Sequence, residues 1–332
     1  QLDKTHGRPK NLNVELQSKF SLQSSAGNVI TGRSNGLEGD DSIANPSGEG
    51  LLAPDVNGID PEGCVLLADR TFWLSEEYRP SLLCCEADGT VTKRFIPEGV
   101  KLPASDVHLG ENLPAHYTKR RPNRGFESLA LSPDESTIWA LMQSPFDHEA
   151  AERSGNVRLL GFDVKEERPT CEYIYRLGDP AATDFATGGV VPDDGKLCAM
   201  ASIGPKALLV LEQSDDGDAK LYRCELGEAT NIMGDVRKLD QVRDLAQAGV
   251  KPIKKTLVAD LASLLPLFAS DITAGQWQPE VGEKVAGLKL EGLAILDSKH
   301  VIIVNDNDFN VDNLFDEAEA KRGSCMWVLS LP

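Results

Sequence analysis

Residues 58–78, G-I-D-P-E-G-C-V-L-L-A-D-R-T-F-W-L-S-E-E-Y, contain the pattern that decides the fold of this chain. They predict two short strands, because two apolar runs are separated by the turn-forming pair Asp69-Arg70. Glu62 stands at the start of the first run, and Glu77 stands at the end of the second. The stretch therefore predicts a two-strand unit with an acid at each end.

The same unit recurs later in the chain with different residues. Residues 125–143 and residues 288–306 each show an acid, an apolar run, a turn and a second apolar run. The acids that open the first strand correspond to one another: Glu62, Glu127 and Glu291. The residues that close the second strand also correspond: Glu77, Gln143 and Asp306. A weaker fourth copy ends at residues 207–212, where Glu212 is the closing acid.

A two-strand unit that recurs with variable insertions is typical of the blades of a β-propeller. Corresponding positions of the blades then converge on one axis. We therefore expect an all-β fold in which Glu62, Glu127 and Glu291 stand on the innermost strands.

Four groups of motifs follow one another along the chain: D-P-E-G with W-L-S-E-E-Y, G-F-E-S-L-A-L-S-P-D with A-L-M-Q-S-P, L-V-L-E, and L-E-G-L-A-I with V-N-D-N-D-F. In order and spacing they resemble the phytase-like propeller family, often described as "esterase-like activity of phytase". The resemblance runs from roughly residue 20 to the C-terminus. It implies a calcium-associated β-propeller of about six blades with a phosphatase or phytase activity. Another blade normally precedes the part matched here, so that blade is either missing from this chain or supplied from elsewhere.

One domain is expected to span residues 1–332, since the repeats extend over most of the chain. Within it, apolar residues recur at helical spacing between about residues 234 and 269, as at Leu239, Val242 and Leu245. This segment is expected to form short helices inserted on one face of the propeller.

The chain carries a formal net charge of -18, from 52 acidic and 34 basic residues. Such a field repels nucleic acids and anionic membranes, which makes both poor partners. An anionic substrate is repelled as well, unless bound cations invert the local potential. No apolar run approaches the ~20 residues of a membrane-spanning helix, and no signal peptide is visible. Because the chain begins at Gln1 without Met, we expect a processed or truncated product that is secreted or extracytoplasmic.

Calcium is the expected cofactor, because clustered carboxylates select hard cations. The candidate ligands are the acids of the repeats: Glu62, Glu77, Glu127, Glu212, Glu291 and Asp306. Like charges brought together at the axis need a cation, or raised pKa values, to coexist. Residues 306–317 also place oxygen ligands at EF-hand spacing, but Val311 replaces the required glycine and a strand precedes the loop. The seven cysteines include no C-x-x-C pair and suggest no zinc site.

Two classes of function fit these features. The first is calcium-dependent hydrolysis of a small-molecule phosphate ester by metal-activated water, with Glu77 and Glu127 as catalytic acids. Arg124 and Arg79 would contact the phosphate, since both are basic residues beside motif positions. The second is a non-catalytic propeller that binds calcium for stability or binds a partner, because a fold alone does not fix a function.

A formal G-x-S-x-G motif at residues 32–36 raises the alternative of a serine esterase. A nucleophile elbow needs a helix directly after the serine, whereas Ser34 is followed by turn-forming residues. No histidine of the sequence is an evident base for this serine. Hydrolysis through a covalent Ser34 intermediate is therefore not expected.

Overall fold

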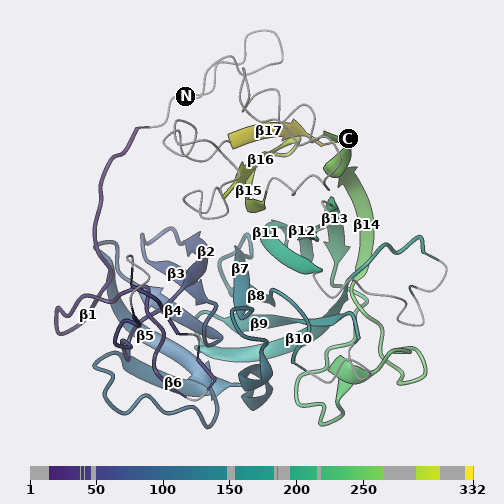
Figure 1. Ribbon diagram of the computed structural model, residues 1–332. Helices are drawn as coiled ribbons and strands as arrows, with labels where there is room; N and C mark the ends of the chain where they lie inside the picture. Colours follow the sequence, from purple (N-terminus) through teal and green to yellow (C-terminus); the bar gives the residue numbers. More distant parts are fainter. Residues whose placement is uncertain are drawn as a thin grey trace.

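The strands of the chain gather into four sheets that stand as blades around a common centre (Figure 1). The computed structural model describes residues 15–37, 39–40, 42–45, 50–147, 154–182, 185, 195–214, 218–264, 289–306 and 326–331. Within that part the fold is all-β, and no helix has the length and hydropathy needed to cross a membrane. The predicted β-propeller is confirmed, with four blades in the described part of the chain.

Blade 1 is an antiparallel sheet extended by two parallel strands. From the centre outward its strands are β2 (Pro61–Leu66), β3 (Phe72–Glu76), β4 (Ser81–Cys85) and β5 (Thr90–Pro97). The parallel neighbours of β5 are β1 (Gln23–Ser24) and β6 (His108–Leu113). A short 3-10 helix, η2 (Ala115–Lys119), follows β6 and leads to the next blade.

Blades 2, 3 and 4 are antiparallel sheets whose first strand is also the innermost one. Blade 2 contains β7 (Phe126–Leu131), β8 (Thr137–Met142), β9 (Asn156–Asp163) and β10 (Arg168–Arg176). Blade 3 contains β11 (Lys196–Gly204), β12 (Ala207–Gln213), β13 (Ala219–Glu225) and β14 (Lys254–Asp260). The described strands of blade 4 are β15 (Leu290–Asp297), β16 (His300–Asn305) and β17 (Met326–Ser330).

The innermost strands β2, β7, β11 and β15 pack side by side in this order. In every blade the first residue of the innermost strand pairs with the last residue of the second: Pro61 with Glu76, Phe126 with Met142, Lys196 with Gln213, and Leu290 with Asn305. The acids Glu62, Glu127 and Glu291 follow directly after the first residue of β2, β7 and β15. Their predicted equivalence is therefore confirmed by the strand register.

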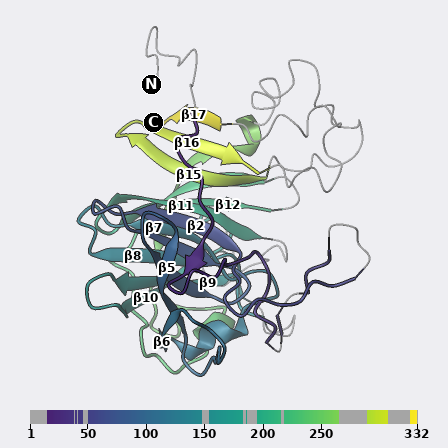
Figure 2. The ribbon, with the colours of Figure 1, turned by 90° about the vertical axis from the view of Figure 1, so that its left-hand side faces the viewer.

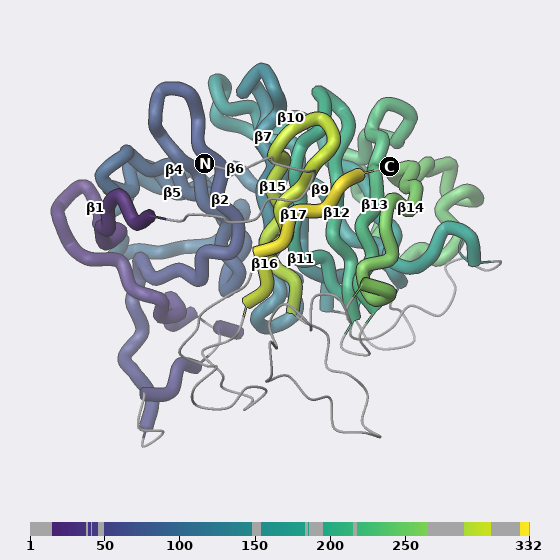
Figure 3. The backbone as a smooth tube through the Cα atoms, turned by 90° about the horizontal axis from the view of Figure 1, so that it is seen from above, coloured from purple at the N-terminus to yellow at the C-terminus, as the bar shows by residue number. Residues whose placement is uncertain are grey.

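Apolar side chains packed between the blades hold the sheets together. Trp73, Phe95 and Phe162 meet in a core shared by blades 1, 2 and 3, with Trp73 and Phe95 stacked at 5.6 Å between ring centroids. A second core joins blades 3 and 4 and includes Leu209 and Trp327. Figure 2 shows β15, β16 and β17 stacked beyond β11, and Figure 3 views the molecule from the side of blade 4.

Among the residues that the structure describes, the strand β2 is covered by a neighbouring blade on one side only. Val65 packs into the core shared with blade 2, whereas Cys64 and Leu66 point the other way and are exposed. The equivalent strand of blade 2, β7, is buried over all but its last residue. Within the described part of the chain, blade 1 therefore has one side of its innermost strand without a neighbouring blade.

The prediction of inserted helices between residues 234 and 269 was wrong for most of this segment. Lys254–Asp260 form β14, which pairs with β13 as the outer strand of blade 3. The helices described within this segment are the three-residue 3-10 helices η5 (Leu239–Gln241) and η6 (Ala262–Leu264). Residues 265–269 lie outside the described part. Gly249 adopts a φ of 69° and Pro252 follows it, so a continuous helix cannot run through this segment. The apolar spacing instead reflects a small cluster in which Leu239 and Leu245 pack.

Candidate functional site

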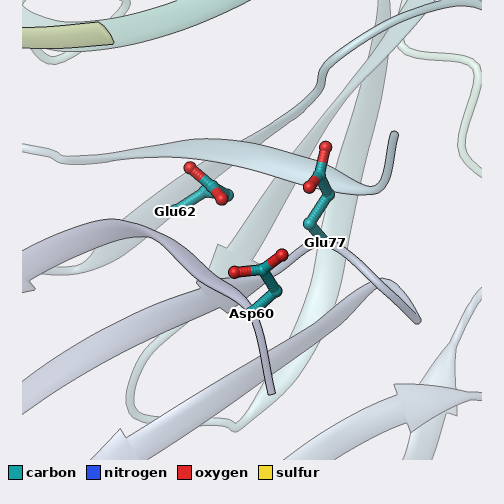
Figure 4. A group of neighbouring side chains, drawn as sticks. All are labelled: Asp60, Glu62 and Glu77. Atoms are coloured by element: carbon teal, nitrogen blue, oxygen red, sulfur yellow. The ribbon is translucent and has the colours of Figure 1, made fainter. Parts of the chain in front are cut away.

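Three carboxylates of blade 1 lie together at the inner end of β2 and β3 (Figure 4). Asp60 precedes β2, Glu62 is in β2, and Glu77 follows β3; one oxygen of each lies within 4.8 Å of the others. The pairing of β2 with β3 produces this arrangement, and the Glu77 amide donates a 3.0 Å hydrogen bond to the Asp60 carbonyl. Asp60 was not among the predicted ligands, although its position two residues before Glu62 places both side chains on one side of an extended chain.

A side-chain amide connects this group to the acid of blade 2. Gln143 Nε2 lies 2.9 Å from Glu77 Oε1 and 2.6 Å from Glu127 Oε2, so it donates toward both carboxylates. Both Glu77 and Glu127 are buried. The two carboxylates are therefore held close together with little access to water.

A glycine allows the two blades to approach closely enough for this bridge. A Cβ atom at Gly125 would lie 2.1 Å from the carbonyl oxygen of Glu77, closer than any side chain can approach. The backbone N–H of Gln143 in turn donates a 2.9 Å hydrogen bond to the Gly125 carbonyl. The backbone of blade 2 therefore contacts the backbone of Glu77 directly. This contact fixes the position from which the Glu77 side chain extends.

The acids raise one another's pKa values. Burial, then the charges of Glu127 and Glu62, raise the pKa of Glu77 to about 10. Burial, then the charges of Glu62 and Glu291, raise the pKa of Glu127 well above its usual range. Crowding by protein atoms and the charge of Asp60 raise the pKa of Glu62 to about 8, although water reaches this exposed side chain and screens it. Without a cation, these groups cannot all be ionised at neutral pH.

The donor set fits a hard divalent cation. Calcium takes carboxylate and carbonyl oxygens at about 2.3–2.6 Å, so ligand oxygens on one ion lie within about 5 Å of each other. Asp60, Glu62 and Glu77 already meet this spacing. Glu127, held by Gln143, lies at the edge of the same group.

The acids of blade 4 form ion pairs with a lysine side chain. Lys289 Nζ lies 3.4 Å from Glu291 Oε1 and 3.1 Å from Asp306 Oδ2. The charges of Glu291 and Asp306 still contribute to the raised pKa of Glu62. The acids of blades 1, 2 and 4 therefore interact electrostatically. Lys289 neutralises part of the charge on the acids of blade 4. The EF-hand positions at residues 308–317 lie outside the described residues.

Glu212 does not lie with these acids. Its carboxylate accepts hydrogen bonds from Tyr175 Oη at 2.6 Å, Lys255 Nζ at 2.6 Å and the Gly178 amide at 2.7 Å. The strand register explains the difference, because Ser214 occupies in blade 3 the position that Glu77 has in blade 1. The predicted correspondence of Glu212 with Glu77 was therefore wrong by two residues.

The two predicted phosphate-binding arginines differ in their surroundings. Arg79 Nη2 forms an ion pair with Asp40, a buried carboxylate from an earlier loop. Arg124 is half-buried, and its guanidinium makes no hydrogen bond or ion pair with the residues that the structure describes, although Nη1 is buried. Arg124 directly precedes Gly125, whose backbone contacts that of Glu77.

Ser34 does not have the setting of a nucleophile. It is buried, and residues 35–37 continue without a helix. Gly36 has a φ of 76°, as in a turn. These features agree with the expectation that the G-x-S-x-G motif is not a nucleophile elbow.

The chain matches known proteins at three levels. The family described as "Phytase-like: Esterase-like activity of phytase" matches residues 6–309. An "Uncharacterized secreted protein" from Arthroderma benhamiae is 26% identical over 208 residues, which are 52% of this chain and 41% of that protein's length. Among solved structures, hydrazine synthase from Kuenenia stuttgartiensis is 10% identical with a TM-score of 0.30, covering 98% of this chain and 90% of that one. A structure of U3-55K is 9% identical with a TM-score of 0.33, covering 75% and 59%.

Proposed function

This chain belongs to the phytase-like family, and we propose that it is a calcium-dependent hydrolase of small phosphate esters. The observation that carries the proposal is the group formed by Asp60, Glu62 and Glu77 together with an arginine, Arg124, that has no ionic partner among the described residues. Carboxylates alone suit a structural ion. An arginine without an ionic partner on the neighbouring blade suits a site that also receives an anion.

Each residue of the site has a role in this proposal. Asp60, Glu62 and Glu77 bind the cation, which when bound neutralises the acids, stabilises negative charge on the phosphate and activates water. Glu127, buried and held by the Gln143 amide, takes a proton from the attacking water. Arg124, whose guanidinium has no partner among the described residues, would donate to the phosphate oxygens. No covalent intermediate is needed, since Ser34 has no helix behind it.

We also propose that the protein acts outside the cytoplasm. The relative from Arthroderma benhamiae is described as secreted. A site of clustered carboxylates with exposed Glu62 suits an environment in which calcium is abundant, because weaker extracellular calcium sites bind at about 0.1–1 mM.

The test is turnover of p-nitrophenyl phosphate by the purified protein in millimolar calcium and in excess chelator. We expect turnover only with calcium, and its loss in Glu77→Gln and Glu127→Gln. Glu225→Gln is the matched control, because Glu225 is exposed and pairs with Arg223 on the surface. Calcium binding without turnover of any phosphate ester would instead support a non-catalytic propeller.

A further inference from the structure

The segment that contains the G-x-S-x-G motif packs against the loop that leads into β2. In this motif segment, residues 31–36, the carbonyl oxygen of Arg33 lies so close to Gly58 that a Cβ atom there would be 1.9 Å away. The two backbones are therefore in direct contact. Gly58 is buried and stands two residues before Asp60, the first carboxylate of the candidate site. The motif segment thus borders the stretch of chain from which Asp60 extends.

The side chain of Asn35 joins the motif segment to this loop. Asn35 is only 7% exposed. Its Nδ2 donates to the Gly58 carbonyl at 2.7 Å and lies 3.2 Å from the carbonyl oxygens of Asp55 and Val56. Its Oδ1 accepts a 3.2 Å hydrogen bond from Arg94 Nη2. Because a guanidinium only donates, the amide oxygen faces Arg94 and the amide nitrogen faces the carbonyls of the loop.

The backbone at Asp60 is held by further hydrogen bonds on both sides. The Ile59 amide donates to the Thr31 carbonyl of the motif segment at 3.0 Å. The Asp60 amide donates to Glu76 Oε1 at 3.3 Å, and the Asp60 carbonyl accepts from the Glu77 amide at 3.0 Å. Asp60 therefore extends from a fixed point beside Glu77, as Figure 4 shows.

We propose that Asn35 is a positioning residue of the candidate cation site. By binding the Gly58 carbonyl it fixes the loop two residues before Asp60, and so keeps this carboxylate within reach of the cation. The inference rests on the proposed function, because it takes the group of carboxylates as ligands of a cation. Replacing a group that orients metal ligands typically weakens metal binding by about 10–100-fold. Asn35 acts through the backbone, so we expect an effect at the lower end of this range.

The experiment measures the Kd for calcium by isothermal titration calorimetry with the full chain. Asn35→Ala should raise the Kd about tenfold. Asn35→Asp should raise it as well, because it also loses the amide donors to the loop. The added negative charge would by itself attract calcium, so an effect of charge and an effect of positioning have opposite signs in this variant. Tighter binding by Asn35→Asp would contradict the proposal.

Asn156→Ala is the matched control for Asn35→Ala. Asn156 is also buried, and its Nδ2 donates to the carbonyls of Leu239 and Val242 at 2.8 and 2.7 Å. Its Oδ1 accepts from Arg176 Nε at 3.1 Å. These contacts join blade 2 to the loop before β14, which carries none of the proposed ligands. Both variants should lose stability in urea unfolding, whereas only Asn35→Ala should lose calcium affinity.

A double-mutant cycle tests whether Asn35 acts through Asp60. Asp60→Asn removes the charge of this ligand, and the combined variant Asn35→Ala with Asp60→Asn should bind calcium about as weakly as Asp60→Asn alone. Fully additive losses would overturn the inference. So would an unchanged Kd in a folded Asn35→Ala protein. Absence of calcium binding by the wild-type protein would instead overturn the proposed function.

A milder variant of the motif segment decides the question if Asn35→Ala does not fold. Thr31 Oγ1 donates to Asp55 Oδ2 at 2.7 Å, and this bond also fixes the loop before β2. Thr31→Val keeps the shape of the side chain and removes the donor. It should raise the Kd for calcium by a smaller factor than Asn35→Ala. An unchanged Kd in this variant would then overturn the inference.

Discussion

Replacing Glu77 by glutamine should remove a large part of the pH dependence of folding stability in the absence of calcium. Glu77 is buried, and its pKa rises from 4.5 to about 10 in the folded protein. Between these values the folded state holds a proton that the unfolded state has released, so stability falls as the pH rises. Glutamine keeps the shape and the acceptor for Gln143 but carries no titrating proton.

The size of the effect follows from the width of this interval. Each pH unit inside it lowers the free energy of unfolding by about 1.4 kcal/mol, so the step from pH 5 to pH 7 lowers it by up to about 3 kcal/mol. In Glu77→Gln this contribution is absent, and the decline should be smaller by about 2–3 kcal/mol. Calcium at 100 times its Kd should restore about 2.7 kcal/mol to the wild-type protein and little to the variant.

Urea unfolding at pH 5 and pH 7, in chelator and in calcium, measures all of these quantities. Glu225→Gln provides the control, because Glu225 is exposed and contributes to no buried group of acids. A wild-type protein that is equally stable at both pH values in chelator would refute the reasoning. So would a variant that gains as much stability from calcium as the wild type.

Three further outcomes are expected. Gly125→Ala should destabilise the protein by about 3 kcal/mol in urea unfolding, because its Cβ would lie 2.1 Å from a backbone oxygen; Gly227→Ala, with nothing within 4 Å, should be close to neutral. Arg94→Leu should lower the free energy of unfolding by about 3–5 kcal/mol, since it leaves Glu76 buried without its partner; the loss should be smaller at pH 5, where Glu76, with a pKa of about 7, is protonated. Ser34→Ala should leave phosphate release from p-nitrophenyl phosphate unchanged, and loss of activity in this variant would favour the esterase alternative.

The parts of the fold that could be predicted from the sequence are those in which pattern and packing agree. Glu62, Glu127 and Glu291 were placed correctly, because each follows the first residue of an innermost strand and the alternating apolar run fixes the register. The propeller followed from the recurrence of this unit.

The remaining features depend on contacts that the local sequence does not contain. The strand β14 shows helical spacing, and only its pairing with β13 and the turn at Gly249 decide its conformation. Glu212 occupies the final position of a weak copy, and a shift of two residues in strand register directs it to Lys255. The pairing of Arg79 with Asp40 joins residues that are distant in sequence, so the availability of an arginine to a ligand could not be predicted.

The contact of Gly125 with the carbonyl of Glu77 also constrains the order of events in folding. The first two strands of each blade are neighbours joined by a short turn, so these local hairpins can form early. Gln143 and Glu127 both belong to blade 2, so Gln143 can meet Glu77 of blade 1 only after blades 1 and 2 have docked. The repulsion between Glu127 and the carboxylates of blade 1 therefore opposes the docking step, whereas the repulsion among Asp60, Glu62 and Glu77 already acts when blade 1 forms.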